Sequence, residues 1–141
     1  MYKLTLFTLV LLTSLSVKAT EYPSVYALGY SKHLVEGEYN ETHNYFAVEW
    51  NNFHVGTFKN SYNNQSYIVA YNIEVWGKHD FTFGGLSGFV HGYHKDKVNI
   101  PMIKGMMPVI VPYVKYTKYK VKPTVGLLGQ AVFITFEIDF N

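Results

Sequence analysis

Three residues of this sequence have side chains suited to proton transfer, nucleophilic attack and hydrogen bonding: His33, Ser61 and Asn60. The imidazole of a histidine can act as a general base near neutral pH, because its ordinary pKa is about 6.5. His33 would act on the hydroxyl of Ser61 or of an acceptor, Ser61 would serve as a nucleophile or orient an ester, and Asn60 would polarise a carbonyl group. A structural interpretation stays open, because Asn60 and Ser61 precede the pair Asn63-Asn64 in a segment typical of a turn.

The segments that must position these residues are predicted to be β-strands, because no ten-residue stretch has apolar residues at helical spacing and alternation recurs instead. The clearest strand is the C-terminal one. It has Val132, Ile134, Phe136, Ile138 and Phe140 on one face and Phe133, Thr135, Glu137 and Asp139 on the other. Near the start of the chain, alternation puts Tyr26, Leu28 and Tyr30 on one face and Gly29, Ser31 and His33 on the other.

The pattern predicts eight strands, over residues 24–34, 43–50, 53–61, 65–76, 80–93, 107–114, 117–125 and 130–140. The expected connections are 36–38, 51–52, 63–64, 77–78, 94–106, 115–116 and 126–129. Eight strands of about ten residues need about 80 residues, and about 40 remain for the connections. The sequence therefore predicts an all-β protein, a closed antiparallel eight-stranded barrel, over residues 20–141.

Residues 1–19 are predicted to be a secretory signal peptide. Lys3 precedes an apolar run of about 14 residues, and Val17-Lys18-Ala19 puts small residues at the −3 and −1 positions of a cleavage site. A retained membrane helix is the alternative, although such a helix needs about 20 apolar residues. The chain is thus expected to be exported.

Composition excludes several kinds of function. The chain has no Cys, so disulfides and thiolate chemistry are excluded. All of its basic residues are Lys, and the net charge of +2 comes from Lys3 and Lys18 in the predicted signal. Without Arg and without a basic excess, a nucleic-acid partner is not expected.

The barrel is predicted to cross the outer membrane, because outer-membrane barrels end in an aromatic strand whose apolar face meets lipid while a polar face lines the lumen. The alternative is a secreted, lipocalin-like barrel with its apolar face around a ligand. With both termini in the periplasm, residues 35–42, 62–64, 94–106 and 126–129 lie outside. His33 and the pair Asn60-Ser61 then lie at the same rim, roughly 10 Å apart, because neighbouring strands are about 4.8 Å apart.

Three segments resemble the lipid A palmitoyltransferase (PagP-like) family of outer-membrane barrels. The first is Ser31-Lys32-His33 followed by Tyr39-Asn40-Glu41. The second runs over 54–71 and contains Phe58-Lys59-Asn60-Ser61-Tyr62, and the third runs over 83–114 and contains Ile100-Pro101 and Met107-Pro108. Together with the C-terminal strand they cover most of residues 25–140.

The resemblance implies an eight-stranded barrel that holds an acyl chain and transfers a palmitoyl group from a phospholipid to lipid A. It matches His33 and Ser61 to the family's catalytic His and Ser. Asn60 stands where the family has Asp, and an amide cannot supply a carboxylate's charge, although it can donate or accept hydrogen bonds. The chain also lacks room for the family's amphipathic N-terminal helix. Whether the chain is an enzyme is therefore left open.

These observations predict a monomeric outer-membrane barrel that binds or acylates an envelope lipid, either phospholipid or lipid A. The alternatives are a non-enzymatic barrel that works through its surface loops and the secreted ligand binder. No cofactor or metal is expected, because His91, His94 and Asp96 would point in different directions. Lys95, Lys97 and Lys104 could meet lipid phosphates or simply be solvated.

Overall fold

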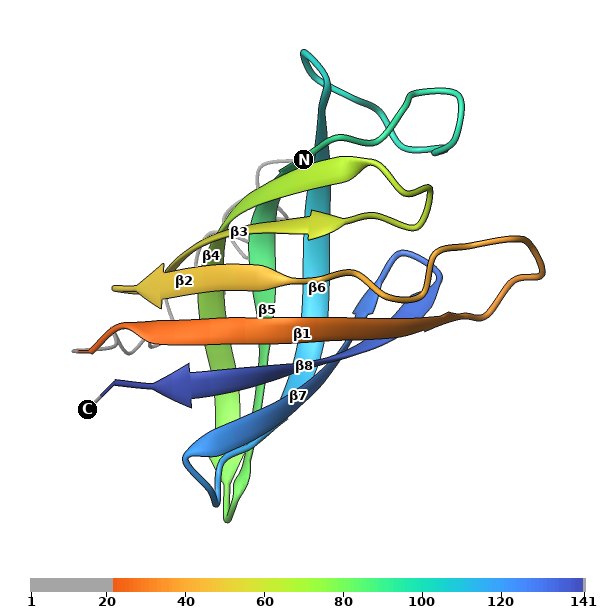
Figure 1. Cartoon of the computed structure of the whole chain (residues 1–141). Helices are drawn as coiled ribbons and strands as arrows, with labels where there is room; N and C mark the ends of the chain where they lie inside the picture. Colours follow the sequence, from red (N-terminus) through yellow and green to blue (C-terminus); the bar gives the residue numbers. More distant parts are fainter. Residues whose placement is uncertain (1–21, 141) are drawn as a thin grey trace, which may run out of the picture.

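Each strand of the computed structural model, which describes residues 22–140, pairs with the next, and the last strand pairs with the first (Figure 1). The predicted closed, antiparallel, eight-stranded barrel is thus confirmed. Its strands are β1 (Ser24–His33), β2 (Phe46–Trp50), β3 (Phe53–Lys59), β4 (Gln65–Lys78), β5 (Phe81–His91), β6 (Met106–Tyr116), β7 (Val121–Leu128) and β8 (Ala131–Asp139). In Figure 1 the front strands β1, β2 and β8 cross the back strands β4 to β6 steeply, as tilted barrel strands do.

The part of the chain described contains no helix capable of spanning a membrane. The predicted signal peptide, residues 1–19, lies outside the described residues.

The barrel has a long-loop end and a short-turn end. The long-loop end carries the connections 34–45, 60–64, 92–105 and 129–130, and the short-turn end carries 51–52, 79–80 and 117–120. The β2–β3 turn is the expected one: Asn51 and Asn52 both have positive φ, 50° and 67°, which suits a tight hairpin. The predicted grouping of the longer connections at one end is therefore confirmed.

Two predicted connections, 77–78 and 115–116, were wrong because their residues belong to strands, and a third, 126–129, was correct only at Gly129. Gly77 and Lys78 end β4, and the turn follows at His79 and Asp80. Lys115 and Tyr116 lie in β6, where Lys115 is held inside the barrel by an ion pair. Residues 126–128 end β7; a Cβ on Gly126 would come within 2.6 Å of the Phe133 ring, so this glycine permits close packing rather than a turn.

A β-bulge in β1 changes which residues face inward. The register with β8 shifts between Ala27 and Gly29, and Leu28 has a φ of 62°. Before the bulge Tyr26 is buried, and after it Ser31 and His33 point inward as well. The expectation that Tyr26 shares a face with Leu28 was therefore wrong, because strict alternation cannot anticipate one extra residue.

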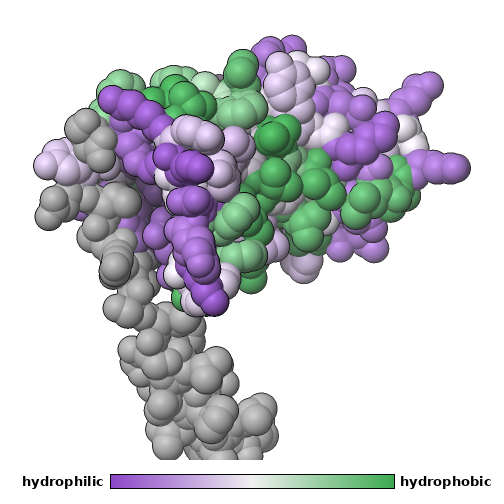
Figure 2. Space-filling view, turned by 90° about the horizontal axis from the view of Figure 1, so that it is seen from below, coloured by the Kyte–Doolittle hydropathy of each residue, from purple (hydrophilic) through white to green (hydrophobic). Residues whose placement is uncertain are grey.

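The outside of the barrel is apolar. On β6, for example, Ile110 is 79% exposed while Val109 and Val111 are 8% and 3% exposed. Figure 2 shows apolar residues gathered over the middle of the visible face, with hydrophilic residues towards the ends of the molecule. Exposed aromatic residues cluster at the short-turn end: Tyr22, Trp50, Phe53, Trp76, Phe81, Tyr119 and Phe140.

The lumen has two layers, and only one of them is polar as expected. At the short-turn end, buried polar side chains fill the barrel. Towards the long-loop end the core is apolar and contains Phe58, Ile68, Leu86, Val90, Val109 and Val111. The structure thus presents an apolar interior beneath the rim that holds the predicted site.

Candidate functional site

The structure brings His33 and Ser61 into contact. His33 is the last residue of β1, Ser61 lies in the loop after β3, and Nε2 of the histidine is 2.9 Å from Oγ of the serine. The connection between β1 and β2 helps to close the gap expected between them, because Asn40 donates its backbone N–H to the Ser61 carbonyl at 2.8 Å. The two residues that were predicted to lie near each other at one rim are therefore directly hydrogen-bonded.

The other side of the His33 ring is covered but not hydrogen-bonded. The Tyr39 ring stacks on it, with centroids 3.8 Å apart and planes 10° apart. Nδ1 of His33 is buried and has no hydrogen-bond partner among residues 22–140. Because none of these residues bonds Nδ1 and so fixes the tautomer, Nε2 can either donate to Ser61 or accept from it.

Asn60 is buried and faces away from this pair. Its amide nitrogen donates to Oγ of Ser66 at 2.9 Å and to the Gly92 carbonyl at 3.0 Å. Its amide oxygen accepts from the backbone N–H groups of Tyr62 and Asn64, at 2.9 and 3.2 Å. The structure therefore does not bring Asn60 to His33; it uses the amide to tie the loop after β3 to the connection after β5.

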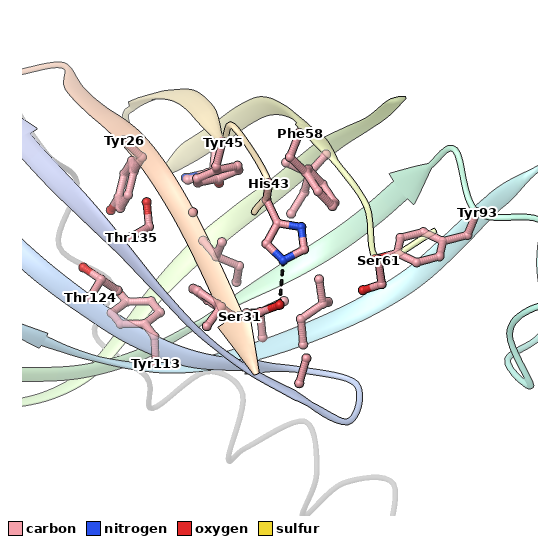
Figure 3. Close-up of a pocket in the computed structure, with 18 residues that line it drawn as sticks. Tyr26, Ser31, His43, Tyr45, Phe58, Ser61, Tyr93, Tyr113, Thr124 and Thr135 are labelled. Atoms are coloured by element: carbon pink, nitrogen blue, oxygen red, sulfur yellow. Dashed lines mark hydrogen bonds between the residues drawn. The ribbon is translucent and has the colours of Figure 1, made fainter. Parts of the chain in front are cut away.

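Beneath Ser61 the barrel encloses a cavity of about 100 Å³, most of whose walls are apolar side chains such as Phe58, Leu86 and Phe133. Figure 3 shows Ser61 and Tyr93 together at one side of this lumen cavity, and Tyr26 and Tyr113 at the other. The cavity thus runs inward from the rim.

The cavity ends on the buried polar layer. Lys115 forms an ion pair with Glu137, and Tyr26 donates its hydroxyl to the same carboxylate at 2.8 Å. A second set of hydrogen bonds is centred on the Glu49 carboxylate, which contacts His54 Nδ1 at 2.9 Å and accepts from the Asn72 amide nitrogen at 2.8 Å. The Tyr113 hydroxyl donates to the Asn72 amide oxygen at 2.6 Å. Because these charges and dipoles satisfy one another, the layer can fill the lumen without unpaired buried charge.

Ser61 also lines a polar pocket outside the barrel. This outer pocket, of about 700 Å³, has Lys32, Tyr39, Glu41 and Lys97 among its lining residues. Lys32 pairs with Glu41 at 3.2 Å, and the pair is exposed. Ser61 therefore stands between an apolar cavity and a polar one.

Tyr93 completes the mouth of the lumen cavity beside Ser61 (Figure 3). Burial raises the pKa of the Tyr93 hydroxyl to about 12, so the phenol is neutral at physiological pH. A neutral phenol can donate a hydrogen bond to an oxygen at this position.

Sequence reasoning missed a second serine–histidine pair. Oγ of Ser31 lies 2.6 Å from Nε2 of His43 (Figure 3). Nδ1 of His43 lies 2.6 Å from the Lys59 carbonyl oxygen. The backbone of His43 bridges two strands, donating to Gly29 and accepting from Lys59. The one sequence signal was that Ser31 stands two residues before His33, on the same strand face.

The lysines and histidines of the 92–105 connection do not join this site, apart from Lys97. Residues 22–140 contain no group of three or more His, Asp or Glu side chains arranged to hold a metal ion. Lys95 and Lys104 are exposed.

No family model matches the sequence, and no curated protein matches it either.

Proposed function

We propose that the protein is an exported outer-membrane barrel that holds the acyl chain of an envelope lipid in its lumen and performs acyl transfer at its rim. The observation that carries the proposal is the position of Ser61, which is bonded to His33 and borders both the apolar lumen cavity and the polar outer pocket. A lipid ester needs both kinds of pocket, because one side of its carbonyl is hydrocarbon and the other side carries a polar headgroup.

Membrane insertion is supported by the outer surface. Continuous exposed apolar surface is rare on soluble proteins but is required of a barrel in lipid. The aromatic residues at the short-turn end resemble the girdles that anchor barrels at an interface. The secreted, lipocalin-like alternative is disfavoured, because its outside would be polar. The long-loop end would then face out of the cell, with the rim at the outer leaflet.

The proposed chemistry uses the rim residues as follows. The acyl chain of a phospholipid enters the lumen cavity until its ester lies beside Ser61. His33 takes the proton of the acceptor hydroxyl through Nε2 as that hydroxyl attacks the ester carbonyl carbon, while Ser61 and Tyr93 orient the ester by hydrogen bonds to its oxygens. The ester C–O bond of the phospholipid then breaks, and the lysophospholipid leaves with the proton from His33. Asn60 positions the loop that carries Ser61. The acceptor is lipid A, as the resemblance to the PagP-like family suggests, with its phosphates near Lys32 and Lys97.

One observation favours a second candidate, a lipid-binding barrel without catalysis. Within the described part of the chain, Nδ1 of His33 has no partner of the kind that usually orients a general base. In that case the two cavities would serve to bind a lipid, and no covalent change would follow.

Mass spectrometry of lipid A and phospholipids separates the two candidates. Cells that express the protein should carry an additional acyl chain on lipid A and a matching lysophospholipid. The change should disappear with Ser61→Ala and with His33→Ala, while both variants still fractionate with the outer membrane and show heat-modifiable mobility. An unchanged lipid profile with the wild-type protein would leave only lipid binding, and a soluble protein would exclude both.

A further inference from the structure

The inner serine–histidine pair, Ser31 and His43, is more completely built for covalent chemistry than the pair at the rim. Nδ1 of His43 can contact the Lys59 carbonyl only as a donor, since a carbonyl oxygen has no proton to give. The proton of the neutral ring therefore sits on Nδ1, and Nε2 presents its lone pair to the Ser31 hydroxyl 2.6 Å away.

This arrangement contains the three parts of an activated nucleophile: a hydroxyl, a base in hydrogen-bond contact with it, and a group that orients the base. The backbone holds the histidine in place, because its N–H donates to Gly29 at 2.8 Å and its carbonyl accepts from Lys59 at 2.7 Å. A Cβ on Gly29 would come within 2.9 Å of the Tyr45 Cβ and 3.3 Å of the His43 Cβ, so the glycine lets the segment that carries His43 lie close to β1.

Both side chains line the lumen cavity, together with Phe58, Leu128 and Phe133. A hydroxyl that faces such walls meets a hydrocarbon chain and its ester rather than a charged molecule. The pair lies deeper than His33 and Ser61, by one inward position along β1.

We propose that Ser31 is a second reactive centre, which forms a covalent acyl-enzyme with linear carboxylic esters whose chain enters the lumen. Oγ of Ser31 attacks the ester carbonyl carbon, and its proton passes to Nε2 of His43. The ester C–O bond breaks, and the leaving alkoxide takes that proton to become an alcohol. Water then gives a proton to Nε2 of His43 and attacks the acyl carbonyl carbon. The C–O bond to Oγ of Ser31 breaks, Ser31 takes the proton from His43, and a carboxylic acid leaves. The site does not depend on the transfer proposed at Ser61.

The test is labelling of the refolded full barrel in detergent micelles with a linear alkyl fluorophosphonate, followed by peptide mass spectrometry. Attack by Ser31 forms an O–P bond and expels fluoride. We expect a single adduct, on Ser31, that is absent from Ser31→Ala and from the heat-denatured barrel. His43→Asn keeps a donor for the Lys59 carbonyl but removes the base, so labelling should slow by about 100-fold or more.

Ser87→Ala serves as the matched control, because Ser87 is exposed on β5 and should not affect labelling. Should His43→Asn fail to show heat-modifiable mobility, His43→Gln tests the same requirement, since it can contact Ser31 but cannot take its proton. A folded barrel that is not labelled, an adduct on Ser61 in place of Ser31, or equal rates with and without the imidazole would each overturn the proposal. Labelling at Ser31 in a protein that leaves lipid A unchanged would uphold it while refuting transfer at the rim.

Discussion

The replacement Asn60→Asp tests the role that the structure gives this buried amide. The wild-type side chain donates two hydrogen bonds and accepts two. A carboxylate would keep the two it accepts, and Ser66 could turn its hydroxyl to donate instead of accept. The Gly92 carbonyl has no proton to offer, so it would lose its partner and face a negative charge 3.0 Å away.

The cost follows from these contacts. Leaving one buried carbonyl unsatisfied costs about 1–3 kcal/mol, and the charge–dipole repulsion adds to it. We expect the free energy of unfolding to fall by about 2–4 kcal/mol, a large part of the 5–15 kcal/mol typical of a domain. Because the folded state disfavours the charged carboxylate introduced at residue 60, it raises the affinity of that carboxylate for a proton. The loss of stability should therefore be greatest well above neutral pH, where the carboxyl group is charged, and should shrink as it is protonated in acid.

Urea titration of the barrel in lipid or detergent, followed by tryptophan fluorescence, measures the effect. Asn63→Asp is the matched control, because it makes the same chemical change on an exposed side chain in the same loop. Equal midpoints for the two variants would refute the argument that Asn60 ties the loop to Gly92. The same result would remove the physical reason for an amide rather than a carboxylate at this position.

Three further outcomes are expected. Lys115→Met should lower the free energy of unfolding by about 3–5 kcal/mol, because it leaves the buried Glu137 carboxylate without its ion-pair partner. Adding Glu137→Gln should recover much of this loss in the same urea titration, and no recovery would contradict the pairing. Leu86→Trp should fill the lumen cavity and abolish fluorophosphonate labelling while heat-modifiable mobility persists, and unimpaired labelling would mean that the probe does not use the cavity. Deleting Leu28 should leave the barrel folded, because the residues on either side already pair with neighbouring residues of β8; loss of the folded band would show that the bulge itself is required.

The architecture was accessible from the sequence because each strand carries its own signal. Alternation on β8 assigned Thr135 and Glu137 to one face, and both are buried in the lumen as that pattern requires. The Asn51-Asn52 turn was equally clear, since few residues accept positive φ. Local rules of this kind need no knowledge of the partner strand.

The site was only partly accessible, because it depends on contacts between distant segments. Barrel topology alone put His33 and Ser61 at one rim. The bond between Ser31 and His43 could not be anticipated, since it depends on the path that the loop before β2 takes to bring His43 against β1. The sequence showed an amide at residue 60, but not that this amide donates its hydrogen bonds to Ser66 and Gly92.

The extra residue in β1 also affects how this chain can be compared with others. Tyr26 in the polar layer and His33 at the rim face the same interior although an odd number of positions separates them. A homologous barrel one residue shorter at this point would keep both side chains inside with an even separation. Gain or loss of that residue during evolution would therefore leave the inward-facing side chains of β1 unchanged. A sequence alignment without a gap at this point would match inward-facing residues of one barrel with outward-facing residues of the other.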